Sequence, residues 1–194
     1  MRVNLQGVKW TLGKGVTADD VLKQLRTHHG RIVKFNNCDR LIYVEEDDSY
    51  YYMLFLTIKD QRKVCEITTA GEITISIREL EQGKNLVDFN FVVLKKTTLR
   101  GIYQYYYHSC SLNQFCIFCM KEYNVVRDKK RKQEMRIQGG QNPSAKVAKQ
   151  VNAKFKGTLE WEVMLRPETF DNLVRELSQL NEFHVTFSKS VRNK

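Results

Sequence analysis

The feature that most constrains this chain is a period-two alternation of apolar and polar side chains between residues 31 and 95. Successive side chains of a β-strand point to opposite faces, so each alternating run predicts a strand with one buried face. Short turn-forming segments such as Asp47-Asp48-Ser49 separate the runs, which favours antiparallel neighbours. We expect strands at 31–35, 40–46, 50–59, 63–69, 72–79 and 88–95, and a first strand within 1–10.

Two helices are predicted from their N-terminal signals. Thr17 is followed three positions later by Asp20, which is a capping-box arrangement, and apolar residues then recur at helical spacing. Ser111 and Gln114 repeat the arrangement in front of a second helical pattern. We expect one helix over 17–29 and a second that begins after Ser111, runs into a basic cluster and ends at the glycine pair 139–140.

The C-terminal part of the chain, 157–194, has a β-α-β pattern of its own. Apolar and polar residues alternate over 159–165 and again over 183–187, and the apolar residues of 167–177 between them have helical spacing. A block of this length buries too little surface to fold alone. We therefore expect it to dock on the core or on a partner subunit.

These elements predict an α+β fold. It consists of a mostly antiparallel sheet meander of six or seven strands, two or three packing helices, and the C-terminal β-α-β element. The predicted division is an α+β core domain at 1–126, a basic helix end and linker at 127–156, and the β-α-β element at 157–194.

The positive charge of the chain is concentrated in one stretch. The whole chain has a net charge of +10, and residues 127–156 hold 10 basic and 2 acidic side chains, a net charge of +8. Such a concentration repels itself unless an anion neutralises it, and phosphate backbones are common anions of this kind. The predicted nucleic-acid-binding residues are Arg127, Lys129, Lys130, Arg131, Lys132, Arg136, Lys146 and Lys149.

Two other interpretations of the basic stretch remain open. It could be a solvated linker, or it could bind an acidic protein partner. A membrane surface is disfavoured because no apolar face opposes the basic residues. The longest apolar run, 50–56, is far shorter than the about 20 residues of a membrane-spanning helix, and residues 1–6 lack the apolar core of a signal peptide. We expect a cytoplasmic protein without a membrane partner.

The cysteines raise the question of a metal site. Five cysteines, an odd number, favour free thiols in a reducing compartment. His108, Cys110, Cys116 and Cys119 are close in sequence, but they lack the two Cys-x-x-Cys pairs of a typical zinc site. Cysteines beside Phe115 are more typical of a packed core. We expect no metal and no cofactor.

His108 also lies beside a run of tyrosines, which offers a catalytic alternative. A metal-independent ribonuclease uses a general base to remove the 2′-hydroxyl proton and cations to stabilise the phosphorane. An RNA-cleaving toxin using His108 and Tyr105 is therefore the enzymatic alternative, and a packed aromatic strand or helix flank is the structural one. Exposed tyrosines beside cations would also suit stacking on single-stranded bases. No Walker A loop, dinucleotide glycine motif or nuclease carboxylate pattern is present in the sequence.

The runs Arg100–Tyr106 and 109–115 resemble a segment of uncharacterised prokaryotic proteins found among antiphage-defence genes. The resemblance implies a bacterial defence context and assigns no catalytic residue. The leading prediction is a non-enzymatic nucleic-acid-binding protein, RNA or DNA, acting as a subunit of a bacterial antiphage-defence or regulatory complex. The RNA-cleaving toxin and a module that binds an acidic protein are the competing predictions, and a protein partner or a homodimer is compatible with all three.

Overall fold

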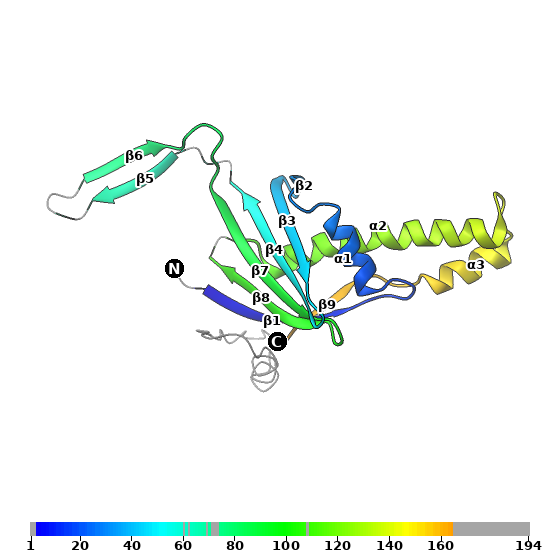
Figure 1. The fold of residues 1–194 in the computed structure, drawn as a ribbon. Coiled ribbons are helices and arrows are strands. Elements are labelled where there is room, and N and C mark those ends of the chain that lie inside the picture. Colours follow the sequence, from blue (N-terminus) through cyan, green and yellow to red (C-terminus); the bar gives the residue numbers. More distant parts are fainter. Residues whose placement is uncertain are drawn as a thin grey trace, which may run out of the picture.

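The structure is a computed structural model of the chain, and it describes residues 3–59, 61, 63–68, 70, 74–107 and 109–164. Figure 1 shows a central sheet flanked by helices, with a strand hairpin and a helical hairpin projecting on opposite sides. The elements are β1 (Val3–Thr11), α1 (Ala18–Arg26), β2 (Val33–Phe35), β3 (Cys38–Glu46), β4 (Tyr50–Ile58), β5 (Lys63–Thr68), β6 (Thr74–Glu79), β7 (Val87–Lys95), β8 (Arg100–Tyr106), α2 (Leu112–Gly139), α3 (Ala145–Lys154) and β9 (Glu160–Met164).

In the part of the chain that the structure describes, the main sheet has seven strands in the order β2-β3-β4-β7-β8-β1-β9, and every pair of neighbours is antiparallel. This confirms the predicted α+β class with an antiparallel meander. For the tyrosine run beside His108 the sequence allows a strand or a helix flank, and the structure shows the strand β8. Its place between β7 and β1 requires Gly101, because a Cβ there would lie 1.8 Å from the carbonyl oxygen of Val93.

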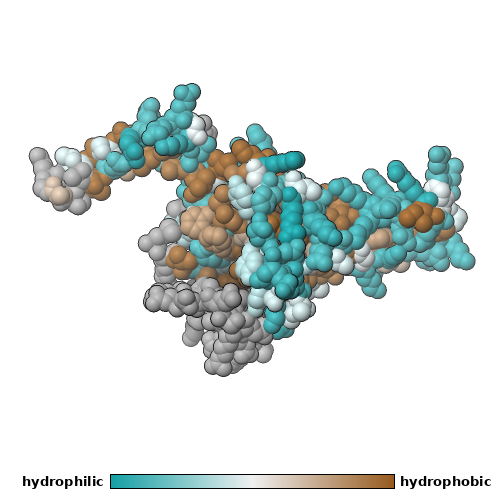
Figure 2. All heavy atoms as spheres, in the orientation of Figure 1, coloured by the Kyte–Doolittle hydropathy of each residue, from teal (hydrophilic) through white to brown (hydrophobic). Residues whose placement is uncertain are grey.

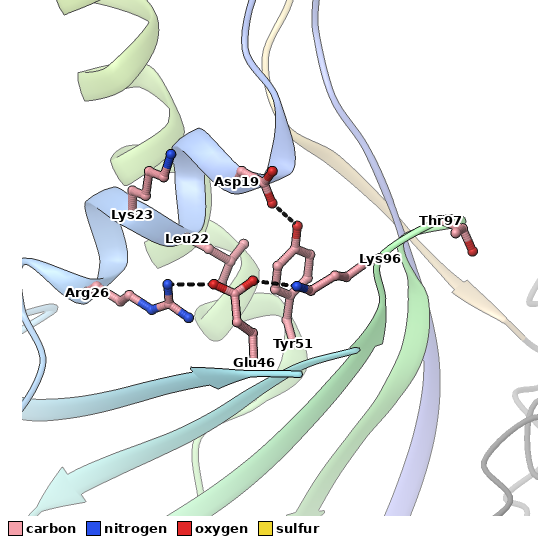
Figure 3. Close-up of a pocket in the computed structure, with 8 residues that line it drawn as sticks. All are labelled: Asp19, Leu22, Lys23, Arg26, Glu46, Tyr51, Lys96 and Thr97. Atoms are coloured by element: carbon pink, nitrogen blue, oxygen red, sulfur yellow. Dashed lines mark hydrogen bonds and ion pairs between the residues drawn. The ribbon is translucent and has the colours of Figure 1, made fainter. Parts of the chain in front are cut away.

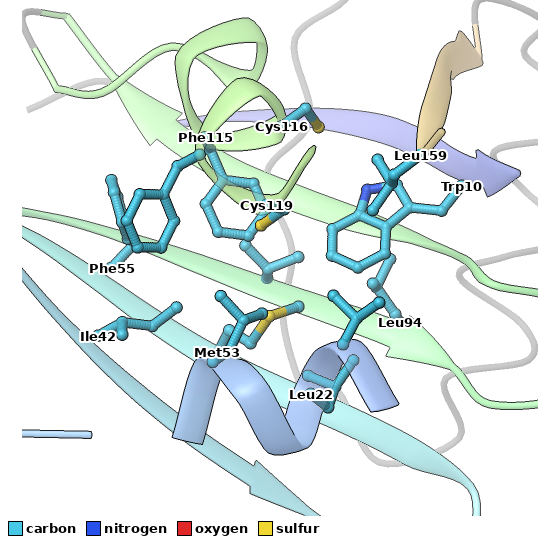
Figure 4. Close-up of a cluster of buried hydrophobic side chains, with 14 of the residues drawn as sticks. Trp10, Leu22, Ile42, Met53, Phe55, Leu94, Phe115, Cys116, Cys119 and Leu159 are labelled. Atoms are coloured by element: carbon cyan, nitrogen blue, oxygen red, sulfur yellow. The ribbon is translucent and has the colours of Figure 1, made fainter. Parts of the chain in front are cut away.

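The core lies between the sheet and the helices α1 and α2 (Figure 4). Phe115 of α2 packs edge-on to Phe55 of β4 at 5.4 Å between ring centroids, and it stacks on Trp10 of β1 at 6.2 Å. The helix α1 starts as predicted: Thr17 accepts a hydrogen bond from the Asp20 amide, and Asp20 accepts one from the Thr17 amide. Apolar residues of α1 and the inner sheet face complete the core, namely Val21, Leu22, Leu25, Ile42, Met53 and Leu94.

The segment predicted as the end of a helix and a linker is mostly helical. The helix α2 begins after the Ser111 N-cap, as expected, and continues through the basic cluster to Gly139, a length of about 42 Å. A tight turn follows, in which a Cβ at Gly139 would lie 2.5 Å from Pro143. Ser144 then caps α3, a helix that the sequence analysis did not predict. No helix in the described part of the chain has a stretch long and apolar enough to cross a membrane.

The strands predicted at 63–69 and 72–79 form a hairpin, but this hairpin does not join the main sheet. Among the described strands, β5 and β6 pair with each other and with no other strand, as a separate two-stranded sheet. The reason is that β4 pairs directly with β7 over nine residues, from Tyr50 with Lys95 to Ile58 with Val87. No sheet edge is left between these two strands, and the hairpin projects from their ends (Figure 1).

The described part of the C-terminal element, residues 157–164, contributes the strand β9 to the main sheet. β9 pairs with the outer edge of β1, and Leu159 just before it is fully buried. Trp161 is half-buried and Val163 is 37% exposed, because no other described strand pairs with the side of β9 that faces away from β1. The helix expected at 167–177 and the strand expected at 183–187 lie outside the described residues.

Candidate nucleic-acid interface

The predicted phosphate-binding residues lie on the projecting helical hairpin, which we call the basic arm and define as residues 127–154. It comprises the C-terminal half of α2, the turn at 140–144, and α3. Figure 1 shows it extending beyond the sheet, and Figure 2 shows mainly hydrophilic side chains over it. The arm therefore presents its charges away from the protein body, where a large ligand has access to them.

One group of basic residues holds the arm to the body. The Arg127 guanidinium donates to the Gly157 carbonyl oxygen at 2.9 Å and pairs with Asp128 at 3.2 Å. Lys130 forms an ion pair with Asp20 of α1, and the Lys129 ammonium donates to the Gln24 side-chain oxygen at 3.1 Å. The contacts with Gly157, Gln24 and Asp20 join positions that lie 30 to 110 residues apart in the sequence.

The contact between Lys130 and Asp20 shifts the titration of the carboxyl group. Partial burial raises the pKa of Asp20, but the hydrogen bonds from Lys130 and Thr17 outweigh it and hold the pKa below its usual value. The charged form of Asp20 is therefore stabilised by the folded protein. Lys130 serves the packing of α2 against α1, and much of its charge is already neutralised.

A second group of basic residues is exposed. Lys132 and Arg136 lie one turn apart on α2, and Lys146 and Lys149 lie one turn apart on α3. Within the part of the chain that the structure describes, none of these four side chains forms an ion pair. We call these four residues the free cations of the arm.

The carboxylates of the basic arm do not neutralise the free cations. The arm contains two, and Asp128 contacts Arg127 and Arg131, at 3.2 and 3.5 Å. Glu134 accepts a hydrogen bond from Lys154 of α3 at 2.8 Å, which lowers the pKa of Glu134. Each carboxylate is thus paired with a cation outside the free set, so neither of them compensates the charge of the four free cations.

A shallow pocket of about 720 Å³ lies at the tip of the arm. Lys132, Arg136 and the backbone of the α2–α3 turn line it, together with Met135 and Pro143. The pocket brings two free cations together beside Gly140, whose positive φ of 64° ends α2. An anion in this pocket can be reached by Lys132 and Arg136 at once. Lys146 and Lys149 lie elsewhere, on the side of α3 away from its buried residue Val151.

Most tyrosines of the two runs are buried or half-buried, whereas Tyr52 and Tyr107 are exposed. Tyr51, Tyr103 and Tyr106 are buried, and the Tyr103 hydroxyl donates to the Cys110 carbonyl oxygen at 2.6 Å. Tyr105 is half-buried and stacks on Tyr103 at 6.3 Å. His108, the proposed base of the ribonuclease alternative, lies outside the described residues.

Tyr52 is the exposed member of the first tyrosine run, at 38%. Its hydroxyl donates to the Asp47 carboxylate at 2.7 Å, which raises the pKa of Tyr52 to about 12. The residue is therefore neutral at physiological pH and already engaged by a carboxylate.

The cysteines considered for zinc lie in the core. Cys110, Cys116 and Cys119 are buried, and burial raises the pKa of the Cys116 thiol to about 12. Zinc binds thiolates, which this environment disfavours. Among the described residues, no group of three or more His, Cys, Asp or Glu side chains comes together as a metal site would require.

A second pocket, of about 360 Å³, lies between α1 and the ends of β3, β4 and β7 (Figure 3). Glu46 lies at its centre and contacts Arg26 at 2.7 Å and Lys96 at 2.6 Å. The hydrogen bonds from Lys96 and Arg26 lower the pKa of Glu46. The Tyr51 hydroxyl donates to Asp19 in the same pocket. Glu46 is already paired with Arg26 and Lys96, and these contacts join α1 to the sheet.

No protein-family model, curated protein or solved structure matches this chain. The runs Arg100–Tyr106 and 109–115, for which the sequence analysis suggested a defence context, lie on β8 and at the start of α2. Of their residues, Gly101, Tyr103 and Phe115 are packed into the core. These runs build the scaffold that carries α2, and the free cations lie beyond them.

Proposed function

We propose that this protein binds nucleic acid without cleaving it, through the basic arm. The observation that supports the proposal is the separation of the basic residues into two groups. Arg127 and Lys130 are engaged by the protein itself, whereas the four free cations have no carboxylate partner among the described residues. A projecting surface with uncompensated charge fits a long polyanion such as a phosphate backbone.

The proposed contacts are to phosphates and not to base edges. Three of the free cations are lysines, whose ammonium groups act as flexible point charges. Contacts of this kind fix the position of a nucleic acid but carry no sequence information. The binding is therefore independent of sequence and strongly dependent on salt.

A binding titration tests the proposal. Labelled single- and double-stranded DNA and RNA are titrated with the full chain, with fluorescence anisotropy as the readout. A variant with Lys132, Arg136, Lys146 and Lys149 replaced by alanine should bind every one of these nucleic acids about tenfold or more weakly. Uniform loss across sequences is the expected signature of lost phosphate contacts.

A charge-matched variant provides the control. Arg31, Lys34, Lys84 and Arg100 are exposed cations outside the basic arm, and replacing these four with alanine removes the same formal charge. This control should retain most of the affinity. Equal losses in the two variants would show that only net charge matters, and no measurable binding by the natural chain would contradict the proposal.

The same samples separate the competing functions. Incubated RNA that remains intact supports binding without cleavage, whereas product formation that depends on His108 would establish the ribonuclease alternative. Capture of an acidic protein with no affinity for nucleic acid would establish the interaction module. The resemblance of Arg100–Tyr106 and 109–115 to antiphage-defence proteins supports proposing that the binding serves a bacterial antiphage-defence or regulatory complex.

A further inference from the structure

The hairpin β5–β6 carries an apolar face that none of the described residues covers. The register pairs Cys65 with Ile77 and Ile67 with Ile75, so these four side chains share one face of the hairpin. Ile67, Ile75 and Ile77 are 62%, 73% and 66% exposed. Figure 2 shows hydrophobic residues along the hairpin and again over the adjoining end of the main sheet.

An isolated two-stranded hairpin in water is at best marginally stable. β5 and β6 contact each other extensively, and the hairpin projects from the ends of β4 and β7 (Figure 1). A hairpin with three largely exposed isoleucines gains most of its possible apolar burial only when another surface covers that face. The exposed apolar face of the hairpin is therefore a suitable surface for binding a partner.

The charged residues of the hairpin indicate which kind of surface can pack against it. Lys63 pairs with Glu79 at 3.3 Å and Arg78 with Glu66 at 3.0 Å, both across the two strands. These charges neutralise each other within the hairpin, so the charged residues that the structure describes on β5 and β6 are all paired. A fitting partner is itself apolar and locally neutral.

We infer that the partner is a second copy of this chain, with the two β5–β6 hairpins packed face to face. A twofold axis brings the same patch of both subunits together, and a neutral apolar face is complementary to itself in such an arrangement. The basic arm projects on the opposite side of the molecule (Figure 1). Two copies with a combined excess of positive charge can therefore meet at the hairpins while their basic arms remain far apart.

The size of the face predicts a weak, reversible dimer. Six residues in a strand extend about 20 Å, so the face of this hairpin is smaller than the about 800 Å² per partner that typifies stable complexes. Val87 and Phe91 of β7, which are 45% and 47% exposed, add apolar surface on the strand that follows the hairpin. The dimer carries two basic arms. If the arms bind nucleic acid, as the proposed function states, the dimer binds a long nucleic acid at two places.

Sedimentation velocity of the full chain without nucleic acid tests this inference. We expect a monomer–dimer equilibrium that shifts with protein concentration. Ile75→Lys and Ile77→Lys together place two charges on the apolar face and should raise the dissociation constant at least tenfold. Ser76→Lys is the matched control, because Ser76 pairs with Glu66 on the other face of the hairpin and its replacement should leave the dimer intact.

Cys65 provides a second readout on the same face. It is exposed, so its alkylation in the monomer should be fast, and it should slow as the protein concentration rises through the dissociation constant. A monomer at all concentrations, or a dimer in which Ile75→Lys/Ile77→Lys has no effect and Cys65 stays equally reactive, would overturn the inference. These measurements involve no nucleic acid, so their failure would leave the proposed binding by the arm untouched.

Discussion

At the scale of single residues, identical side chains in the basic arm have different roles. Lys130 and Lys132 are two positions apart on the same helix, yet Lys130 reaches Asp20 of α1 while Lys132 lines the pocket at the tip of the arm. Helical geometry accounts for the difference, since two positions place side chains about 200° apart around the axis. The sequence shows a continuous basic run, and the helix distributes it over two faces.

This division predicts different effects on stability. Lys130→Ala removes the partner of a half-buried carboxylate and should lower the free energy of unfolding by about 0.5–1 kcal/mol. Lys132→Ala should change it by less than about 0.5 kcal/mol, because Lys132 has no charged partner among the described residues. Urea denaturation measures both. A larger loss for Lys132→Ala than for Lys130→Ala would mean that the roles are reversed.

Glu46 yields a prediction about pH. The hydrogen bonds from Lys96 and Arg26 lower its pKa from the usual value of 4.5, so the folded protein favours the charged carboxylate. A lowered pKa adds stability at pH values above 4.5, and this contribution disappears as the pH falls through the folded-state pKa. Glu46→Gln should therefore destabilise the protein most near pH 7, and the difference from the natural chain should shrink in acid. Thermal unfolding across this range measures it, and a constant difference would refute the assignment.

At the scale of elements, patterns that depend on neighbouring residues were predictable and contacts between distant residues were not. The alternating runs and the capping signals at Thr17 and Ser111 lead directly to the sheet and to the starts of α1 and α2. α3 was missed because only Val151 of its residues is buried, so it shows no apolar stripe. Ser144 followed by strong helix formers was the signal that could have revealed it.

For the candidate site, too, the sequence predicted the positions of the residues but not their contacts with distant parts of the chain. All eight predicted phosphate-binding residues lie on the basic arm, as their positions in sequence require. Which of them are free depends on partners such as Asp20 and Gly157, which lie far away along the chain. The apolar face of β5–β6 was visible as alternating isoleucines, but the period-two pattern cannot tell a covered face from an exposed one.

The strand β9 leads to a prediction about how the C-terminal element is attached. Leu159 is fully buried, whereas Trp161 is half-buried on an edge strand. Leu159→Ala should lower the free energy of unfolding by about 2–5 kcal/mol, as expected for a buried large-to-small change. Trp161→Ala should cost less, although tryptophan is the larger residue. Chemical denaturation of the two variants checks the order, and the reverse order would show that Trp161 anchors the element.

At the scale of the whole molecule, the two projections have opposite chemistry. The β5–β6 hairpin is apolar on one face and neutral in its paired charges, and the basic arm carries uncompensated positive charge. The sheet and its core lie between them and hold them apart (Figure 1). The proposed association through the hairpin and the proposed binding through the arm can therefore occur at the same time.

The most direct test of the central claim is the salt dependence of nucleic-acid binding by the arm. The logarithm of the association constant for duplex DNA is measured against the logarithm of salt concentration between about 50 and 200 mM. Replacing Lys132, Arg136, Lys146 and Lys149 with alanine should flatten the slope by up to about 3.6, at about 0.9 per phosphate contact. The charge-matched variant at Arg31, Lys34, Lys84 and Arg100 should keep the natural slope. An unchanged slope in the arm variant would contradict the claim that the basic arm binds nucleic acid.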